Sequence, residues 1–157
     1  MCTLPLEHPL GRAYAQAHRA GEHLADLRHL VEAFWKTQVH HVITDFDPKT
    51  KQASMTVGKL DPSPVAAAAI RCGEIIYNCA PALGYLAFEL ALLDTGAVQK
   101  DAQFPIESFK EGSFKRQSRL LKGLNAEHRA AIEGLQPYNG CQWTAKLASL
   151  SESCRGR

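Results

Sequence analysis

The stretch RCGEIIYNCAPALGYLAFELA, residues 71–91, decides the fold of this 157-residue chain. It belongs to a segment, 64–94, without an internal turn signal, so we expect one long central helix. Ser63 is the expected N-cap, followed by a proline at the first helical position. Between Ile75 and Leu93 the helix is apolar on nearly every side, which is typical of a helix at the centre of a bundle or in a membrane.

An asparagine and a proline interrupt this run. Pro81 has no amide hydrogen and its ring crowds the carbonyl of Tyr77, so we expect the helix to kink or break there. The side-chain amide of Asn78 lies beside the gap and is expected to satisfy a freed carbonyl group. We therefore interpret Asn78 and Pro81 as structural residues.

The membrane alternative has some support. The run approaches the ~20 apolar residues that a membrane span needs, and Ala80 with Gly84 forms a small-xxx-small pair. Against it, Asn78 and Glu89 are polar, and an amphipathic helix earlier in the chain needs a core to cover. We expect a soluble bundle and no membrane.

The preceding segments predict a helix and a β-hairpin. In 10–38, apolar residues recur every three or four positions, which predicts an amphipathic helix with Trp35 helping to anchor its C-terminal end. The segment 39–60 alternates with period two on both sides of the turn DPKTK, which predicts a hairpin. Because two strands alone are marginal, we expect the apolar face of the hairpin to rest on helices.

The C-terminal third is less regular. We expect a polar loop over 95–124 and two short helices over 125–153, the first capped by Asn125 and stopped by Gly134. Residues 1–9 form an extension. The fold class is mainly α (α+β): a helical bundle around a long, Pro-kinked central helix, with one β-hairpin between helices 1 and 2, in a single domain spanning 1–157.

Composition narrows the function classes. Eighteen Lys and Arg residues nearly balance sixteen Asp and Glu residues, so charge gives no general reason to expect nucleic acid or an anionic membrane as partner. The five cysteines form no CxxC motif, which favours reduced thiols in a cytoplasmic, by default bacterial, protein. The histidines show no metal-ligand spacing with a third donor, so we expect no metal and no cofactor.

Several short motifs resemble a set of bacterial helical proteins of unknown function. The motifs are GEIIYN, QFPIESF, LKGL and IEGLQPY, which lie at 73–78, 103–109, 121–124 and 132–138. In those proteins a long helix reads roughly G-E-I-L-H-N-L-R-S-A-L-D-H-L, and F-P-I and Q-P-Y signatures follow. The preceding helix and hairpin fit the same layout, so the resemblance covers nearly the whole chain.

The departures from this pattern bear on activity. Where the relatives have Arg, Ser, Asp and His, this chain has Ala80, Pro81, Gly84 and Tyr85. The missing Arg and His form an R-x4-H element that is similar to the ribonuclease signature of HEPN domains. The relatives also tend to continue into a D-K-H-R segment. The resemblance therefore implies a degenerate or truncated, distantly HEPN-like member.

Two groups of residues remain as candidate sites. Arg12 and His18 have R-x5-H spacing, in the range associated with HEPN-type RNA cleavage, where Arg steadies a phosphate and His moves protons. Lys115, Arg116 and Arg119 belong to the one basic cluster and are candidates for phosphate contacts. Solvated surface side chains are the simpler interpretation of both groups.

The sequence supports a non-catalytic module that binds a protein partner or self-associates as a homo-oligomer. It leans against an enzyme, because no polar cluster converges on a cleft. One alternative is an HEPN-like RNA-directed nuclease or toxin-type protein, with nucleic acid as a disfavoured partner. Another is a truncated fragment without function.

Overall fold

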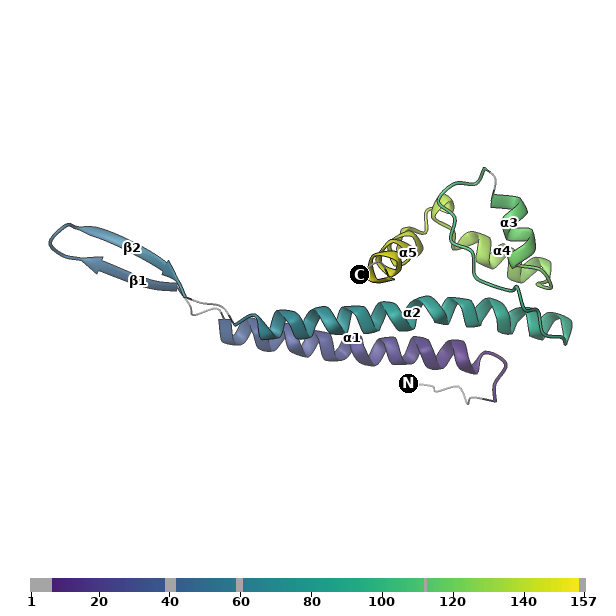
Figure 1. The fold of residues 1–157 in the computed structure, drawn as a ribbon, viewed down its shortest axis with the longest axis horizontal. Helices are drawn as coiled ribbons and strands as arrows, with labels where there is room; N and C mark the ends of the chain where they lie inside the picture. Colours follow the sequence, from purple (N-terminus) through teal and green to yellow (C-terminus); the bar gives the residue numbers. More distant parts are fainter. Residues whose placement is uncertain (1–6, 39–41, 59–60, 112, 156–157) are drawn as a thin grey trace. The chain divides into compact units, whose positions relative to one another are not determined.

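The computed structural model describes residues 7–38, 42–58, 61–111 and 113–155 (Figure 1). The order of the helices and strands matches the predicted fold class, mainly helical with one hairpin between the first two helices. The elements are α1 (Gly11–Gln38), β1 (Val42–Asp47), β2 (Gln52–Val57), α2 (Ser63–Thr95), α3 (Ser113–Leu120), α4 (Ala126–Gly134), the 3-10 helix η1 (Pro137–Asn139) and α5 (Gln142–Arg155). Most of the expected extension, 1–6, lies outside the described residues.

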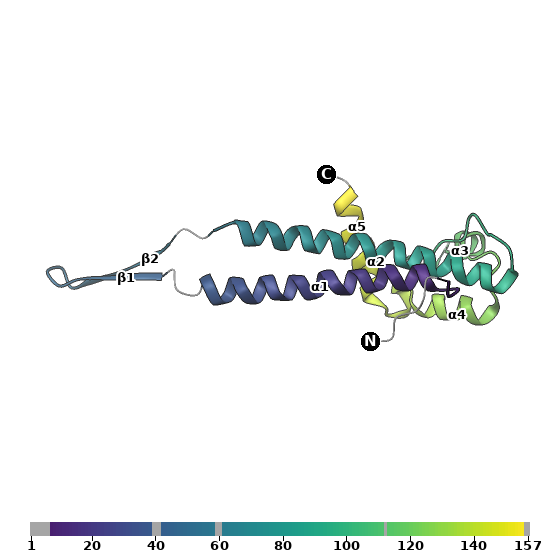
Figure 2. The ribbon, with the colours of Figure 1, turned by 90° about the horizontal axis from the view of Figure 1, so that it is seen from below.

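The chain forms two compact units. Unit 1 comprises Met1–Gly21 with Gly73–Arg157, and unit 2 comprises Glu22–Cys72. In each unit a part of α1 lies beside a part of α2 (Figures 1 and 2). The sequence predicts a single domain, one that would fold and unfold cooperatively as a whole, and this stays a prediction.

Helix α2 continues through Pro81 without a break (Figure 1), so the expected single central helix is found and the alternative of a break into two helices is excluded. The kink at Pro81 stays a prediction. The amide of Asn78 donates to the Glu74 carbonyl oxygen at 2.7 Å, one turn back on its own helix and not at the carbonyl of Tyr77. Pro81 has no amide hydrogen to donate to the Tyr77 carbonyl, and Asn78 does not replace that donor, because its amide bonds to Glu74.

Helix α2 begins one residue earlier than the sequence predicts. The helix begins at Ser63, and the Asp61 carboxylate accepts from the Ser63 backbone N–H at 2.9 Å. Asp61 therefore supplies the side-chain acceptor that the sequence assigned to Ser63.

By length and composition alone, α2 could cross a membrane, and it is the one helix of the described residues for which this holds. Core helices of soluble proteins have the same composition, so this is weak evidence. The absence of a membrane stays a prediction.

The hairpin has the expected turn. Asp47 pairs with Gln52, and the Asp47 carboxylate accepts from the Lys49 backbone N–H at 2.8 Å and the Thr50 hydroxyl at 2.9 Å. These bonds lower the pKa of Asp47, the Lys49 N–H contributing most. The side chain of Asp47 thus fixes the turn.

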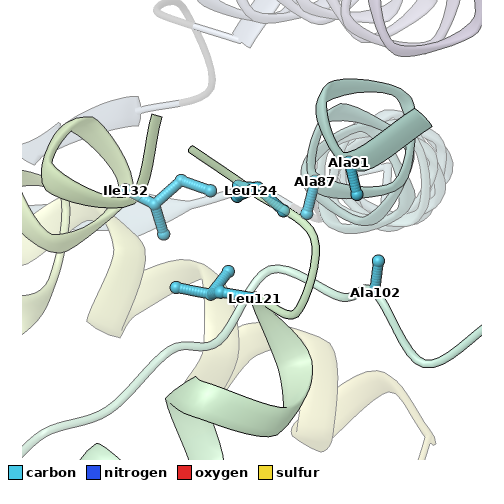
Figure 3. Close-up of a cluster of buried hydrophobic side chains, with 6 residues drawn as sticks. All are labelled: Ala87, Ala91, Ala102, Leu121, Leu124 and Ile132. Atoms are coloured by element: carbon cyan, nitrogen blue, oxygen red, sulfur yellow. The ribbon is translucent and has the colours of Figure 1, made fainter. Parts of the chain in front are cut away.

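The core of unit 1 lies where α2 meets the C-terminal segments (Figure 3). Two alanines of α2 are fully buried and let the following chain approach its backbone closely. The cluster consists of Ala87, Ala91, Ala102, Leu121, Leu124 and Ile132, with Leu90 and Phe104 packed against it. Between the two buried leucines, Gly123 adopts a φ of 92°, a left-handed conformation that favours glycine. The LKGL motif is therefore a turn whose two leucines are buried.

Gln136 joins the QPY segment to the FPI segment. Its side chain is fully buried, and its amide nitrogen donates to the carbonyl oxygens of Pro105 and Ile132 at 2.8 and 3.0 Å. Its side-chain oxygen accepts from the Glu107 backbone N–H at 3.0 Å. This arrangement, here called the Gln136 bridge, ties the QPY segment to the FPI segment.

The segment 95–124 contains a helix, α3, that the sequence did not predict. Helix α4 is capped as expected, with the Asn125 side chain accepting from the His128 backbone N–H. Gly134 is the last residue of α4, and Leu135, with a φ of −90°, follows it as the C-cap. Gly134 therefore does not serve as a left-handed stop.

Candidate functional site

The structure gives Arg12 and His18 separate partners. The Nε of Arg12 donates to Oε1 of Glu89 at 3.0 Å, and its guanidinium lies 5.5 Å from the ring centroids of Tyr85 and Phe88. The ring of His18 lies against Tyr14, at 6.1 Å between centroids. The side chains that were candidates for RNA cleavage therefore face different neighbours.

Glu89 explains why Arg12 is held in place. The Glu89 side chain is 3% exposed, and it also accepts from the Ala13 backbone N–H at 3.3 Å. A buried carboxylate needs a counterion and hydrogen bonds. Arg12 is thus the counterion of Glu89. It also lines an open cavity of about 430 Å³, together with Tyr85 and Phe88.

A second polar network joins the end of α2 to the start of α4. The Asp94 carboxylate accepts from the backbone N–H and the side-chain amide of Asn125, both at 2.8 Å. The Nδ1 of His128 lies 2.8 Å from Oδ2 of Asp94. The Asp94 side chain is only 9% exposed. Asp94 and His128 lie 34 residues apart, and the sequence offered only the Asn125 cap as a sign of this network.

The network lowers the pKa of Asp94, mainly through the Asn125 backbone N–H, with smaller contributions from His128. A carboxyl whose pKa is lower in the folded state stabilises the fold above its ordinary pKa of about 3.9, and this contribution is lost as pH falls through the folded value. We interpret the network as a structural link between two helix ends.

Replacing Asp94 by alanine should therefore destabilise the protein at neutral pH, and the difference from wild type should shrink as pH falls below about 4. Urea unfolding at about pH 7, 5 and 3 measures this. Asp101→Ala, at an exposed position, is the control and should cost little throughout. A difference that stays constant with pH would rule out this role for the carboxylate.

The basic cluster is only partly described. Arg119 is exposed at the end of α3. Lys115 and Arg116 lie on α3 as well, but their side chains are outside the described residues. A phosphate-binding role for the three stays a prediction.

The most unusual feature lies on the helices of unit 2. An apolar groove with a volume of about 240 Å³ runs between α1 and the start of α2. We call it the helix groove, and its lining includes Leu30, Val31, Phe34, Trp35, Pro64 and Val65. Trp35 is 62% exposed and Val65 is 60% exposed. The expectation that Trp35 anchors the end of α1 in a core is therefore wrong.

The hairpin also presents apolar side chains to solvent. Val42, Thr44 and Phe46 are every second residue of β1, so they lie on one face of the hairpin. Met55 pairs with Thr44 and Ala53 pairs with Phe46, so both lie on the same face. We call Val42, Phe46 and Met55 the hairpin face, and they are 51%, 59% and 76% exposed. The expectation that helices cover this face is wrong.

Among the described residues of unit 2 no hydrophobic side chain is buried. The described residue that is buried is His23, whose Nδ1 lies 3.4 Å from Nη1 of Arg71. Arg71 in turn lies 3.6 Å from Asp26, so polar contacts link the two helices. Exposed apolar groups gathered in this way make this surface the candidate functional site.

Sequence reasoning missed this surface because the apolar periodicity of α1 and the alternation of β2 look the same whether the covering layer comes from the same chain or from another one.

No protein-family model, curated protein or solved structure matches the chain.

Proposed function

We propose that this chain is a non-catalytic interaction module that docks a protein partner through the helix groove and the hairpin face of unit 2. The observation that carries this proposal is the lack of a buried hydrophobic side chain among the described residues of unit 2. A segment of 51 residues needs an apolar core to be stable. A partner would supply the missing cover.

The chemistry of the surface suits a protein partner. Tryptophan and other aromatic side chains supply much of the binding energy at protein interfaces, and Trp35, Phe34 and Phe46 lie on the two surfaces. Residues 22–72 contain six acidic and six basic side chains, so their formal net charge is zero. Such a unit has no basic field to attract nucleic acid.

No observation on the described residues favours the RNA-directed nuclease alternative. The Nε of Arg12 is paired with a buried carboxylate, and its guanidinium lies against two rings, so Arg12 already has a structural role. Among the described residues, the lining of the cavity beside it includes no histidine or carboxylate, the groups that most often transfer protons in active sites.

Photo-cross-linking in cells tests the interaction module. A benzophenone amino acid in place of Trp35 should form a discrete adduct with a protein, because the groove is where a partner docks. The matched control places the same group at Phe109, an aromatic residue of unit 1 that is 79% exposed. Absence of adducts at both positions, or equal smears from both, would argue against the proposal.

A further inference from the structure

We propose that the cavity beside Arg12 binds a small organic carboxylate, a molecule with one negative charge on an apolar body. We call this cavity the Arg12 pocket. The residues that line it all belong to unit 1, so the inference is independent of the proposed function, which concerns unit 2.

Three segments of the chain build the walls of the Arg12 pocket: the start of α1, one face of α2 and the loop that follows α2. The lining includes Arg12, Gly84, Tyr85, Phe88, Ala102 and Gln103. The backbone N–H groups of Ala102 and Gln103 donate to the carbonyl oxygens of Gln99 and Leu120 at 3.1 and 3.0 Å, so the loop wall is held in place. The volume of about 430 Å³ is that of an ordinary small-molecule site.

The guanidinium of Arg12 supplies hydrogen-bond donors to this pocket. A guanidinium carries five N–H groups in a planar fork. Nε bonds to Glu89, whereas the two Nη groups have no hydrogen-bond partner among the residues that the structure describes. The bond to Glu89 and the two rings, each 5.5 Å from the guanidinium carbon, hold the fork in one orientation. Such a fork binds a carboxylate with two parallel hydrogen bonds.

Gly84 makes room for the apolar body of the ligand. Glycine inside a helix is less stable than alanine, and Gly84 does not have the positive φ that would require glycine. A Cβ at this position would meet no atom within 4 Å, so close packing does not require glycine either. The missing side chain instead leaves space beside Tyr85 and Phe88, whose rings can pack against an apolar group.

The buried carboxylate of Glu89 determines which anion fits. Glu89 is 3% exposed and already offsets the charge of Arg12, so the local charge is zero before a ligand binds. A monocarboxylate adds one negative charge, which the guanidinium can share between the two carboxylates. A phosphate ester adds up to two charges near a buried anion and is repelled more strongly. The pocket therefore favours a carboxylate over a phosphate.

An NMR chemical-shift titration of the isotope-labelled full chain tests the Arg12 pocket. The probe is 3-phenylpropionate, which joins one carboxylate to an apolar ring. Because so small a probe buries little surface, we expect a dissociation constant on the order of 1 mM. The neutral 3-phenylpropionamide should bind roughly tenfold more weakly, since it cannot form charge-assisted hydrogen bonds. Phenyl phosphate at pH 8, where it carries two charges, should also bind more weakly.

Gly84→Leu blocks the pocket without threatening the fold. Leucine favours a helix over glycine, and the added Cβ has open space, so the urea midpoint should not fall. The affinity for 3-phenylpropionate should nevertheless fall at least roughly tenfold, because the new side chain occupies the space of the ligand. The matched control is Gly73→Leu, at a glycine of the same helix where a Cβ also meets no atom within 4 Å. It should bind the probe as wild type does.

Arg12→Lys tests the fork itself. Lysine keeps a positive charge for Glu89 but lacks the planar pair of donors, so we expect roughly tenfold weaker binding with the helix content unchanged by far-UV circular dichroism. Equal affinity of wild type and this variant, or of the acid and its amide, would overturn the role of Arg12.

Three further results would overturn the proposal. The first is the absence of shifts with 3-phenylpropionate up to about 10 mM, tenfold above the expected constant. The second is equal binding by wild type and Gly84→Leu, which would place the probe elsewhere. The third is tighter binding of phenyl phosphate, which would overturn the choice of a carboxylate. None of these results bears on the proposed function, because that is tested separately by the Trp35 cross-link.

Discussion

Replacing Gln136 by alanine should destabilise the protein by roughly 3–5 kcal/mol, since the substitution leaves buried backbone groups unsatisfied and opens a cavity. The Gln136 side chain is fully buried and bonds to three backbone groups. Ile132 keeps a second donor, the Leu135 backbone N–H at 3.2 Å. The Pro105 carbonyl and the Glu107 N–H lose the partners that the Gln136 side chain supplied.

Urea unfolding at fixed protein concentration measures this effect. Gln142→Ala, at an exposed position near the start of α5, is the control and should change stability by less than about 0.5 kcal/mol. A Gln136→Ala variant within about 1 kcal/mol of wild type would mean that the bridge contributes little.

Gln136→Glu distinguishes the two halves of the bridge. The carboxylate can still accept from the Glu107 N–H, but it has no hydrogen to donate to the Pro105 carbonyl. Burial raises the pKa of such a carboxyl. We therefore expect this variant to be strongly destabilised at neutral pH and to recover partly in mild acid, where the protonated carboxyl can donate.

The second large effect is expected at Arg12. Arg12→Ala leaves the Glu89 carboxylate, which is 3% exposed, without its counterion. Breaking a fully buried pair costs about 3–5 kcal/mol. The Arg12 side chain is 54% exposed, so solvent screening should reduce the cost to roughly 2 kcal/mol.

A double-mutant cycle isolates the pair. Arg12→Leu with Glu89→Leu removes both charges, and we expect the double variant to be more stable than Arg12→Leu alone, because no uncompensated charge remains. Arg28→Ala, an exposed arginine on the same helix, is the control. Equal stability of Arg12→Ala and Arg28→Ala would contradict this account of Glu89.

These effects also constrain any test of the nuclease alternative. A loss of RNA cleavage in Arg12→Ala could follow from unfolding alone. His18→Ala, assayed together with circular dichroism, is a second probe that separates a loss of chemistry from a loss of the fold.

Local signals allowed most of the fold to be predicted from the sequence. The turn at Asp47, the cap at Asn125 and the apolar run of α2 each depend on neighbours within a few residues, and all three are found where expected. Helix α3 was not predicted because it is short and mostly polar in sequence. Its buried leucine, Leu120, stands at its last position.

The polar contacts inside the structure could not be predicted. Gln136 bonds to Glu107 across 29 residues, and Arg12 bonds to Glu89 across 77. A glutamine or an arginine in a sequence is usually solvated, and nothing nearby marks these two as bridges. The exposure of Trp35 also runs against the usual fate of an aromatic residue on an amphipathic helix.

The division of unit 1 into two segments has a consequence for how the protein is made. Glu89 emerges from the ribosome 77 residues after Arg12, a delay of roughly 4–15 s at ordinary synthesis rates. During that interval residues 22–72 are synthesised, whose described part buries no hydrophobic side chain, and Arg12 waits for the Glu89 carboxylate. The nascent chain must therefore keep its apolar surfaces soluble until α2 and the C-terminal helices arrive, which makes this a protein whose yield should respond to the supply of chaperones.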